Sequence, residues 1–165
     1  MFCSRRPAFG LALMSREPWI DLRMEHFGDA GVPSVAVDYV RCDRRFTILG
    51  THPVPPPTPE GFRLRNQQLD AVADHVSGLT HTVMVAGDLN VTPWSYWFRR
   101  FVVRSRLNDT APGYGVHPTW FGPSFLFAIP IDHVLVSGDL VVIGRRISRD
   151  VGSDHRALIV DLTFQ

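Results

Sequence analysis

Residues 83–95, VMVAGDLNVTPWS, constrain the fold more than any other stretch of this chain. They continue an apolar run that begins at residue 81, and a run of this length bounded by turn residues predicts a fully buried β-strand. Such a strand needs cover on both faces, which requires a layered fold. The run stops at Gly87. Asp88 and Asn90 follow two residues apart, so in an extended segment their side chains point the same way, although an ordinary turn also uses these residues.

Periodic segments along the rest of the chain predict two helices among many short strands. The first helix begins at Thr58 as a possible cap with Pro59 in its first turn, and ends near Ser77. The second begins after Pro93. Strands are expected at residues 9–16, 18–27, 33–40, 46–52, 81–87, 129–137, 140–148 and 155–164, with a turn at residues 41–45. The pattern predicts an α/β sandwich, and the length of 165 residues predicts a single domain, residues 1–165.

Charge and cysteine content exclude several classes of protein. The formal net charge is +1, so no global field favours nucleic acid. All 17 basic residues are arginine, which a GC-rich genome explains, although the planar guanidinium also suits phosphate. The two cysteines, Cys3 and Cys42, allow a disulfide but do not suggest a disulfide framework, and no C-x-x-C metal spacing exists. The N-terminal apolar run is too short for a signal peptide or a membrane span, so we expect a soluble chain, cytoplasmic by default.

Polar side chains interrupt the apolar strands near their ends, where they are costly unless paired. If these ends share one edge of the sandwich, the side chains converge on one site. Carboxylate and amide oxygens suit Mg²⁺ or Mn²⁺, and a histidine paired with an aspartate moves protons near pH 7. Metal-assisted attack of water on a phosphate ester needs such groups. The candidates are His52, Asp88, Asn90, Asp132, Asp154 and His155. His133 follows Asp132, points to the other face of the strand and is expected to be structural.

Five motifs, taken in order, resemble the endonuclease/exonuclease/phosphatase superfamily, which has the DNase I-like fold. They are GTHPVPP, VMVAGDLNVTPWS, HPTW, PIDHVLVSG and VGSDHRALIVDL, and the resemblance covers residues 10–162. It implies two β-sheets flanked by helices.

The resemblance also implies a role for each polar residue. His52 resembles the histidine that contacts the scissile phosphate, and Asp88 the acid that activates the attacking water. Asn90 resembles the amide that binds phosphate or metal. Asp132 resembles the partner that orients the catalytic histidine, and His155 resembles the histidine that stabilises the phosphate or transfers a proton. Asp154 resembles a metal ligand, so Asp88, Asn90 and Asp154 are the expected ligands of Mg²⁺ or Mn²⁺.

One departure from the family pattern concerns the N-terminus. Family members begin with a strand carrying an Asn, followed by a strand that ends in a metal-binding Glu. Both precede the segment GLALMSR, and this chain begins too late to hold them. We therefore expect an N-terminally shortened member that lacks the first strands of the fold. The apolar sheet surface left open would be covered by a second copy, in a homodimer, or by rearranged N-terminal strands.

The expected function is divalent-metal-dependent phosphodiester hydrolysis, most simply by a DNA endonuclease with little sequence specificity. Arginines that cluster in sequence are the candidates for contacts to the DNA backbone: Arg63, Arg65, Arg99 and Arg100.

Two alternatives stay open. A phosphatase or phospholipid phosphodiesterase of the same fold would use exposed aromatic residues, although core packing also explains them. The aromatic residues are Trp94, Tyr96, Trp97, Phe98, Trp120, Phe121, Phe125 and Phe127. The second alternative is a non-catalytic or partner-dependent half-domain.

Overall fold

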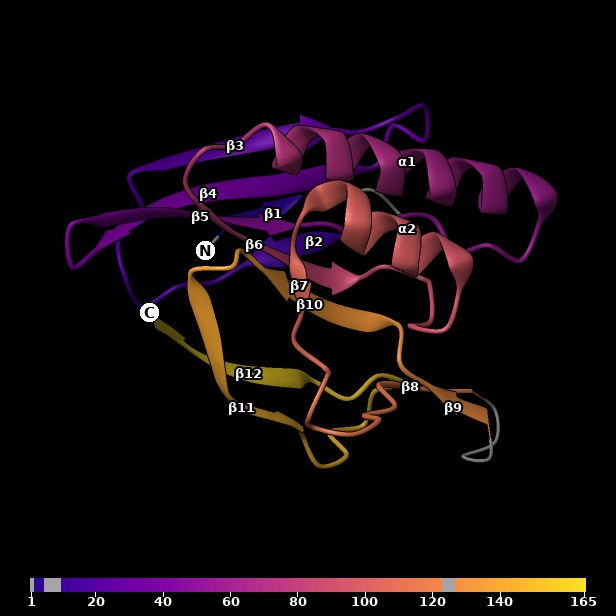
Figure 1. Cartoon of the computed structure of the whole chain (residues 1–165). Helices are drawn as coiled ribbons and strands as arrows, with labels where there is room; N and C mark the ends of the chain where they lie inside the picture. Colours follow the sequence, from indigo (N-terminus) through magenta and orange to yellow (C-terminus); the bar gives the residue numbers. More distant parts are fainter. Residues whose placement is uncertain (1, 5–9, 123–126) are drawn as a thin grey trace.

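A six-stranded sheet forms the centre of the computed structural model, which describes residues 2–4, 10–122 and 127–165 (Figure 1). Only β5 and β6 run parallel, and every other neighbouring pair is antiparallel. The strand order is β3 (Asp21–His26), β4 (Pro33–Arg41), β5 (Arg44–Gly50), β6 (Thr82–Asp88), β10 (Asp132–Val136) and β7 (Asn108–Asp109).

Helices α1 (Pro59–Ser77) and α2 (Tyr96–Ser105) lie side by side on one face of this sheet (Figure 1). A parallel strand pair needs a long crossover connection, and α1 provides it between β5 and β6. The predicted start of α1 is confirmed, because the Thr58 hydroxyl accepts a hydrogen bond from the Gly61 N–H at 3.0 Å. The main core fills the space between sheet and helices; it includes Leu49, Leu69, Val72, Val85 and Phe101.

Three two-stranded sheets complete the fold: β1 (Phe2–Ser4) with β2 (Leu11–Leu13), β8 (Trp120–Phe121) with β9 (Ala128–Ile129), and β11 (Leu140–Ile147) with β12 (Leu158–Phe164). Leu11, Leu13 and Trp19 pack against Val35 and Val37 of β4, on the sheet face away from the helices. The N-terminal segment therefore covers part of the apolar sheet face that was expected to be exposed.

Part of that face stays accessible. A groove of about 520 Å³ lies between Phe46 and Met84 of the central sheet and Leu162 and Phe164 of β12. Whether a second copy occupies this groove in a homodimer stays a prediction. Neither of the described helices has the length and apolarity to cross a membrane.

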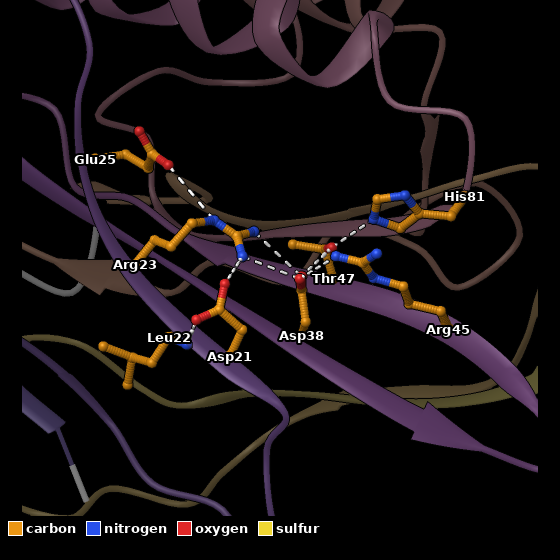
Figure 2. A network of polar contacts seen from close by, with 8 residues as sticks. All are labelled: Asp21, Leu22, Arg23, Glu25, Asp38, Arg45, Thr47 and His81. Carbon is orange, nitrogen blue, oxygen red and sulfur yellow. Dashed lines mark hydrogen bonds and ion pairs between the residues drawn. The ribbon is translucent and has the colours of Figure 1, made fainter.

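Asp38 organises a polar network on β3, β4 and β5 (Figure 2). It pairs with Thr47, on the part of β5 nearer the β4–β5 hairpin, whereas His52 follows the other end of β5. Its fully buried carboxylate accepts hydrogen bonds from Arg23 at 3.0 and 3.2 Å, from Arg45 at 2.6 Å and from Thr47 at 2.6 Å. Because the Thr47 hydroxyl donates to Asp38, it accepts from Nε2 of His81 at 2.7 Å. Burial alone would raise the pKa of Asp38, but these donors, Arg23 first, outweigh it and hold that pKa well below its usual range.

Most predicted elements are confirmed, with shifted ends. The predicted strand at residues 129–137 is broken into β9 and β10, because Pro130 has no N–H for a ladder. The last strand begins at Leu158 rather than His155, since residues 154–156 leave the β11 ladder and pair with the β8 region instead. The short strands β7 and β8 were not predicted, because two-residue strands have no periodicity to detect.

Candidate active site

Four of the predicted site residues come from four different segments and meet at one edge of the sheet. His52 lies just beyond the carboxyl end of β5, and Asp88 ends the parallel neighbour β6. Asp132 begins β10 directly opposite Asp88 in the antiparallel register. His155 follows the turn after β11 and forms an isolated bridge with Trp120 of β8. The carboxyl ends of parallel strands are a common place for binding sites, and this arrangement follows that rule.

Gly87 permits the close approach of the β5 and β6 ends. Its φ is +151°, and a Cβ added there would lie 1.9 Å from the carbonyl oxygen of Thr51. The neighbouring Thr51 N–H donates to the carbonyl of Ala86 at 3.1 Å, which continues the ladder past the end of the strands. Only glycine fits this position. It therefore sets the spacing between the residues that follow, His52 and Asp88.

Asp132 and His155 form a hydrogen-bonded pair. Oδ2 of Asp132 accepts from Nδ1 of His155 at 2.8 Å. A proton held on Nδ1 fixes the tautomer, so the lone pair of the neutral ring is on Nε2. Nε2 lies 3.8 Å from Oδ2 of Asp88. The pair can therefore accept or deliver a proton beside Asp88.

Asp88 lies between the two imidazole rings. Its Oδ2 is 3.6 Å from Nε2 of His52, and its Oδ1 accepts from the Asn90 N–H at 2.8 Å. Burial raises the pKa of Asp88, and the nearby charge of Asp132 adds to this; the Asn90 hydrogen bond and the two histidines oppose it. A carboxylate in this environment holds a proton more readily than an exposed one, which suits a group that accepts a proton from water.

Arg65 supports the Asp88–Asn90 loop from α1. Only 3% of Arg65 is exposed, and its Nη1 donates to the carbonyl of Asn90 at 2.5 Å. Asn90 has a left-handed φ of +51°, and its Nδ2 donates to the carbonyl of Pro53 at 2.9 Å. This loop is thus tied both to α1 and to the segment after His52. The position of Arg65 was open to prediction, because it lies four residues before Leu69 on the buried helix face.

An open cavity of about 550 Å³ lies over these residues. His52, Asp88, Asn90, Asp154 and His155 line it together with six apolar residues, none of them among the predicted site residues: Pro55, Pro56, Pro57, Trp120, Ile129 and Ile131. A few polar groups at the base of a largely apolar concavity are typical of a ligand site.

The cluster best arranged to hold a cation differs in part from the expected ligand set. Asp88, Asp132 and His155 each offer one ligand atom, and these three atoms lie within 4.8 Å of one another. Asp154 is exposed and lines the cavity outside this cluster. Adjacent residues in an extended segment point to opposite sides, so His155 and Asp154 do not both face Asp132. Two facing carboxylates fit a hard divalent cation, because a cation relieves the repulsion between them.

The four arginines expected to contact substrate do not line the cavity. Arg65 is buried, as described above. Arg63 pairs with Glu60 at 2.8 Å, and Arg100 pairs with Asp70 at 2.9 Å. Arg99 is exposed on α2.

Several supporting residues were missed in the sequence. The fully buried Thr119 hydroxyl accepts from the N–H of Asp132 at 3.1 Å and so fixes the start of β10. The Thr51 hydroxyl, beside His52, is hydrogen-bonded to the Ser34 hydroxyl at 2.7 Å and accepts a hydrogen bond from Nε2 of Gln68 at 3.2 Å. No local pattern identifies such buried polar contacts, because their partners are far away in the sequence.

The structural role expected for His133 is supported. It is 2% exposed, its Nε2 donates to the Val91 carbonyl at 2.8 Å, and its ring packs against Phe98. The expectation that the aromatic residues pack in the core holds for Phe98 but is wrong for Trp94, Tyr96 and Phe127, which are 59%, 62% and 68% exposed. Phe125 lies outside the described residues.

Comparison with known proteins identifies what this chain resembles. Residues 2–155 match the Endonuclease/Exonuclease/phosphatase family. An endonuclease/exonuclease/phosphatase from Beutenbergia cavernae superposes with a TM-score of 0.75 at 22% identity, covering 92% of this chain and 46% of that one. The human Nocturnin catalytic domain gives 0.70 at 20% identity, covering 90% and 60%.

A third structure, humanized D. rerio TDP2 with 14 mutations, gives a TM-score of 0.68 at 13% identity and covers 88% of this chain and 67% of that one. The chain thus spans about half to two-thirds of the length of these three proteins. A comparison with curated proteins found no significant match.

Proposed function

Because this chain belongs to the Endonuclease/Exonuclease/phosphatase family, we propose that it is a divalent-metal-dependent phosphodiester hydrolase, most simply a nuclease with little sequence specificity. The observation that carries this proposal is the Asp132–His155 pair, which faces Asp88 at the base of an open cavity. A positioned acid–base pair beside a second carboxylate is the arrangement that hydrolysis of a phosphate ester needs.

In the proposed reaction, each site residue has a separate role. Asp88 accepts a proton from the attacking water through Oδ2. Asp132 keeps the ring of His155 oriented, and the protonated ring donates from Nε2 to a phosphoryl oxygen or to the leaving group. His52, on the other side of Asp88, contacts the phosphate. The N–H of Asn90 keeps the Asp88 carboxylate in place.

A divalent cation would be held by Asp88 and Asp132, with Asn90 and Asp154 at the margin of the cavity. When bound, it would neutralise phosphate charge and make water more acidic. Mg²⁺ or Mn²⁺ fits these oxygen donors better than zinc does.

The near-neutral charge of the chain supports weak, backbone-directed binding of DNA rather than tight binding. A second candidate, a phosphatase or phospholipid phosphodiesterase, gains support from the exposed Trp94, Tyr96 and Phe127. The same chemistry at Asp88 and His155 would serve either substrate, because the fold does not select it.

The test compares substrates and variants under matched conditions. Purified protein is incubated with plasmid DNA, with bis(p-nitrophenyl) phosphate and with phosphatidylcholine vesicles, each in Mg²⁺, Mn²⁺ or EDTA. Asp88→Asn and His155→Ala are measured beside Asp43→Asn and His26→Ala, which change exposed residues of the same types outside the site.

We expect metal-dependent cleavage that both site variants lose, by about 10²–10⁴-fold, and that both controls keep. Cleavage that survives in the site variants would indicate a contaminating enzyme. No cleavage of any substrate would contradict the proposal and favour a non-catalytic or partner-dependent half-domain.

A further inference from the structure

A second, smaller cavity lies behind one wall of the candidate active site. It has a volume of about 310 Å³, near the lower end for small-molecule sites. Pro130 lines this second cavity, whereas its neighbours Ile129 and Ile131 line the active-site cavity. A single extended segment therefore separates the two cavities.

Two further chain segments connect them. Trp94 lines the second cavity and follows the active-site loop that ends at Asn90. His117 also lines it and lies close in sequence to Trp120, which lines the active-site cavity. A substrate group attached to the reacting phosphate would thus reach the second cavity past the segment that joins β9 to β10.

The polar chemistry of the second cavity comes from Arg145 and His117. Nη1 of Arg145 lies 2.7 Å from Nδ1 of His117. A guanidinium has only donors, so Nδ1 must accept and the neutral ring carries its proton on Nε2. Burial, together with the Arg145 charge, lowers the pKa of His117, which is consistent with a neutral ring. His117 therefore offers an N–H donor without a positive charge.

Arg145 itself is incompletely satisfied. It is 8% exposed, and its buried Nε has no hydrogen-bond partner among the described residues. Asp109 is close enough to act on it electrostatically, but no ion pair joins the two. A largely buried guanidinium with incomplete hydrogen bonding is costly, so a ligand in the cavity that brings acceptor atoms to the part of Arg145 lining it would stabilise the cation.

Trp94 provides an apolar platform. More than half of this side chain is exposed although it is one of the largest apolar groups in the chain, and it lines the cavity together with prolines and glycines. Flat heterocycles stack on such a surface, and their ring nitrogens and carbonyls accept hydrogen bonds. The combination of a stacking ring with donors suits a nucleobase better than an acyl chain, which has no acceptors along its length.

We propose that the cavity lined by Trp94, His117 and Arg145 binds a nucleobase flanking the phosphodiester that is cleaved. The base stacks on Trp94, and its acceptor atoms receive hydrogen bonds from His117 and Arg145. This proposal rests on the phosphodiesterase function and narrows it, because it selects nucleic acid as the substrate. It also assigns a role to an exposed tryptophan that core packing does not explain.

The first experiment measures binding without turnover. Fluorescein-labelled octathymidylate is titrated with wild-type protein, Trp94→Ala and Trp94→Phe in EDTA, with fluorescence anisotropy as the readout. Tyr96→Ala is the control, because Tyr96 is equally exposed but does not line the cavity. Loss of one base–aromatic stack weakens binding by about 5- to 150-fold. We expect this loss in Trp94→Ala, recovery in Trp94→Phe and no change in Tyr96→Ala.

The second experiment compares turnover of the p-nitrophenyl ester of thymidine 5′-phosphate with turnover of methyl p-nitrophenyl phosphate, which has no base. Trp94→Ala and His117→Ala should reduce kcat/KM at least five times more for the thymidine substrate. Equal losses on both substrates, or equal effects of Trp94→Ala and Tyr96→Ala on binding, would overturn the proposal. The proposal would also be overturned if Trp94→Ala lost binding to phosphatidylcholine vesicles but kept the wild-type affinity for the oligonucleotide.

Failure of the proposed hydrolase function can be distinguished from failure of the proposed nucleobase site. If the wild-type protein cleaves neither substrate but Trp94→Ala still weakens oligonucleotide binding, the proposed hydrolase function fails and the nucleobase site stands.

Discussion

Replacing Gly87 with alanine tests how the structure positions its candidate active site. The new Cβ would lie 1.9, 3.1 and 3.4 Å from the O, C and N atoms of Thr51, all of which belong to the backbone and cannot rotate away. The φ of +151° adds a cost of about 1–3 kcal/mol for a residue other than glycine, and overpacking adds about 1–3 kcal/mol. A less flexible unfolded chain returns about 0.4–1 kcal/mol. We expect a net loss of about 1–5.5 kcal/mol of unfolding free energy.

Gly113→Ala is the matched control. Gly113 also has a positive φ, +89°, but a Cβ there meets nothing within 4 Å, so overpacking does not arise. Only the backbone cost of about 1–2 kcal/mol and the same return of about 0.4–1 kcal/mol from the unfolded chain apply. Both variants are unfolded in urea and followed by circular dichroism. The folded fraction of Gly87→Ala should also lose catalysis by about 10²-fold, because a shift of roughly 1 Å between His52 and Asp88 misplaces reacting groups. Equal stability losses in the two variants would refute the steric argument.

Three further changes have definite expected outcomes. Asp38→Asn should lower the unfolding free energy at pH 7 by about 2–3 kcal/mol in urea titrations. Because the pKa of Asp38 is lowered on folding, its stabilisation is complete above the unfolded value near 3.9 and is lost as pH falls below it, so the variant should show a shallower acid decline. Asp132→Asn should reduce kcat by about 10²–10⁴-fold without unfolding the protein, because His155 loses its orienting carboxylate. Arg65→Ala should cost about 1.5–3 kcal/mol in the same urea titrations and raise the crystallographic B-factors of the loop at Asn90.

Each of these three expectations can fail in a specific way. An Asp38→Asn variant whose stability follows the wild-type curve at every pH would contradict the depressed pKa. Unchanged kcat in Asp132→Asn would remove the histidine pair from the mechanism. A stable Arg65→Ala variant with an ordered loop would show that the hydrogen bond to Asn90 contributes little.

The sequence predicted the convergence of the site because the cost of polar groups at strand ends is a local property. His52, Asp88, Asp132 and His155 each interrupt an apolar run, and all four meet in the structure. What the sequence could not supply is register. The pairing of Asp132 with Asp88 depends on β10 lying next to β6, and nothing local to either strand determines its neighbour.

The arginines show where clustering in sequence misled the prediction of substrate contacts. Clustering in sequence suggested a shared role, but Arg65 turned inward because it shares a helix face with Leu69 and Val72. Helical periodicity contained that information, so this placement was predictable in principle. The salt bridge between Arg63 and Glu60 could also have been predicted, because the two residues lie three apart on one helix. The salt bridge between Arg100 and Asp70 could not, because it forms only where α2 packs on α1.

The way in which the site is assembled has a consequence for folding. Its contacts join the end of β5 to β6, β6 to β10, and both β6 and β10 to the segment before β12, and none of them is local in sequence. Formation of α1 brings β5 and β6 together, but the Asp132–His155 pair closes only after the C-terminal third of the chain has docked. Contacts that close distant loops form late, because chain entropy opposes them until the rest is in place. The geometry of the candidate site therefore reports completed folding, because a chain that has formed only its helices and its parallel strand pair has not yet brought Asp132 and His155 together.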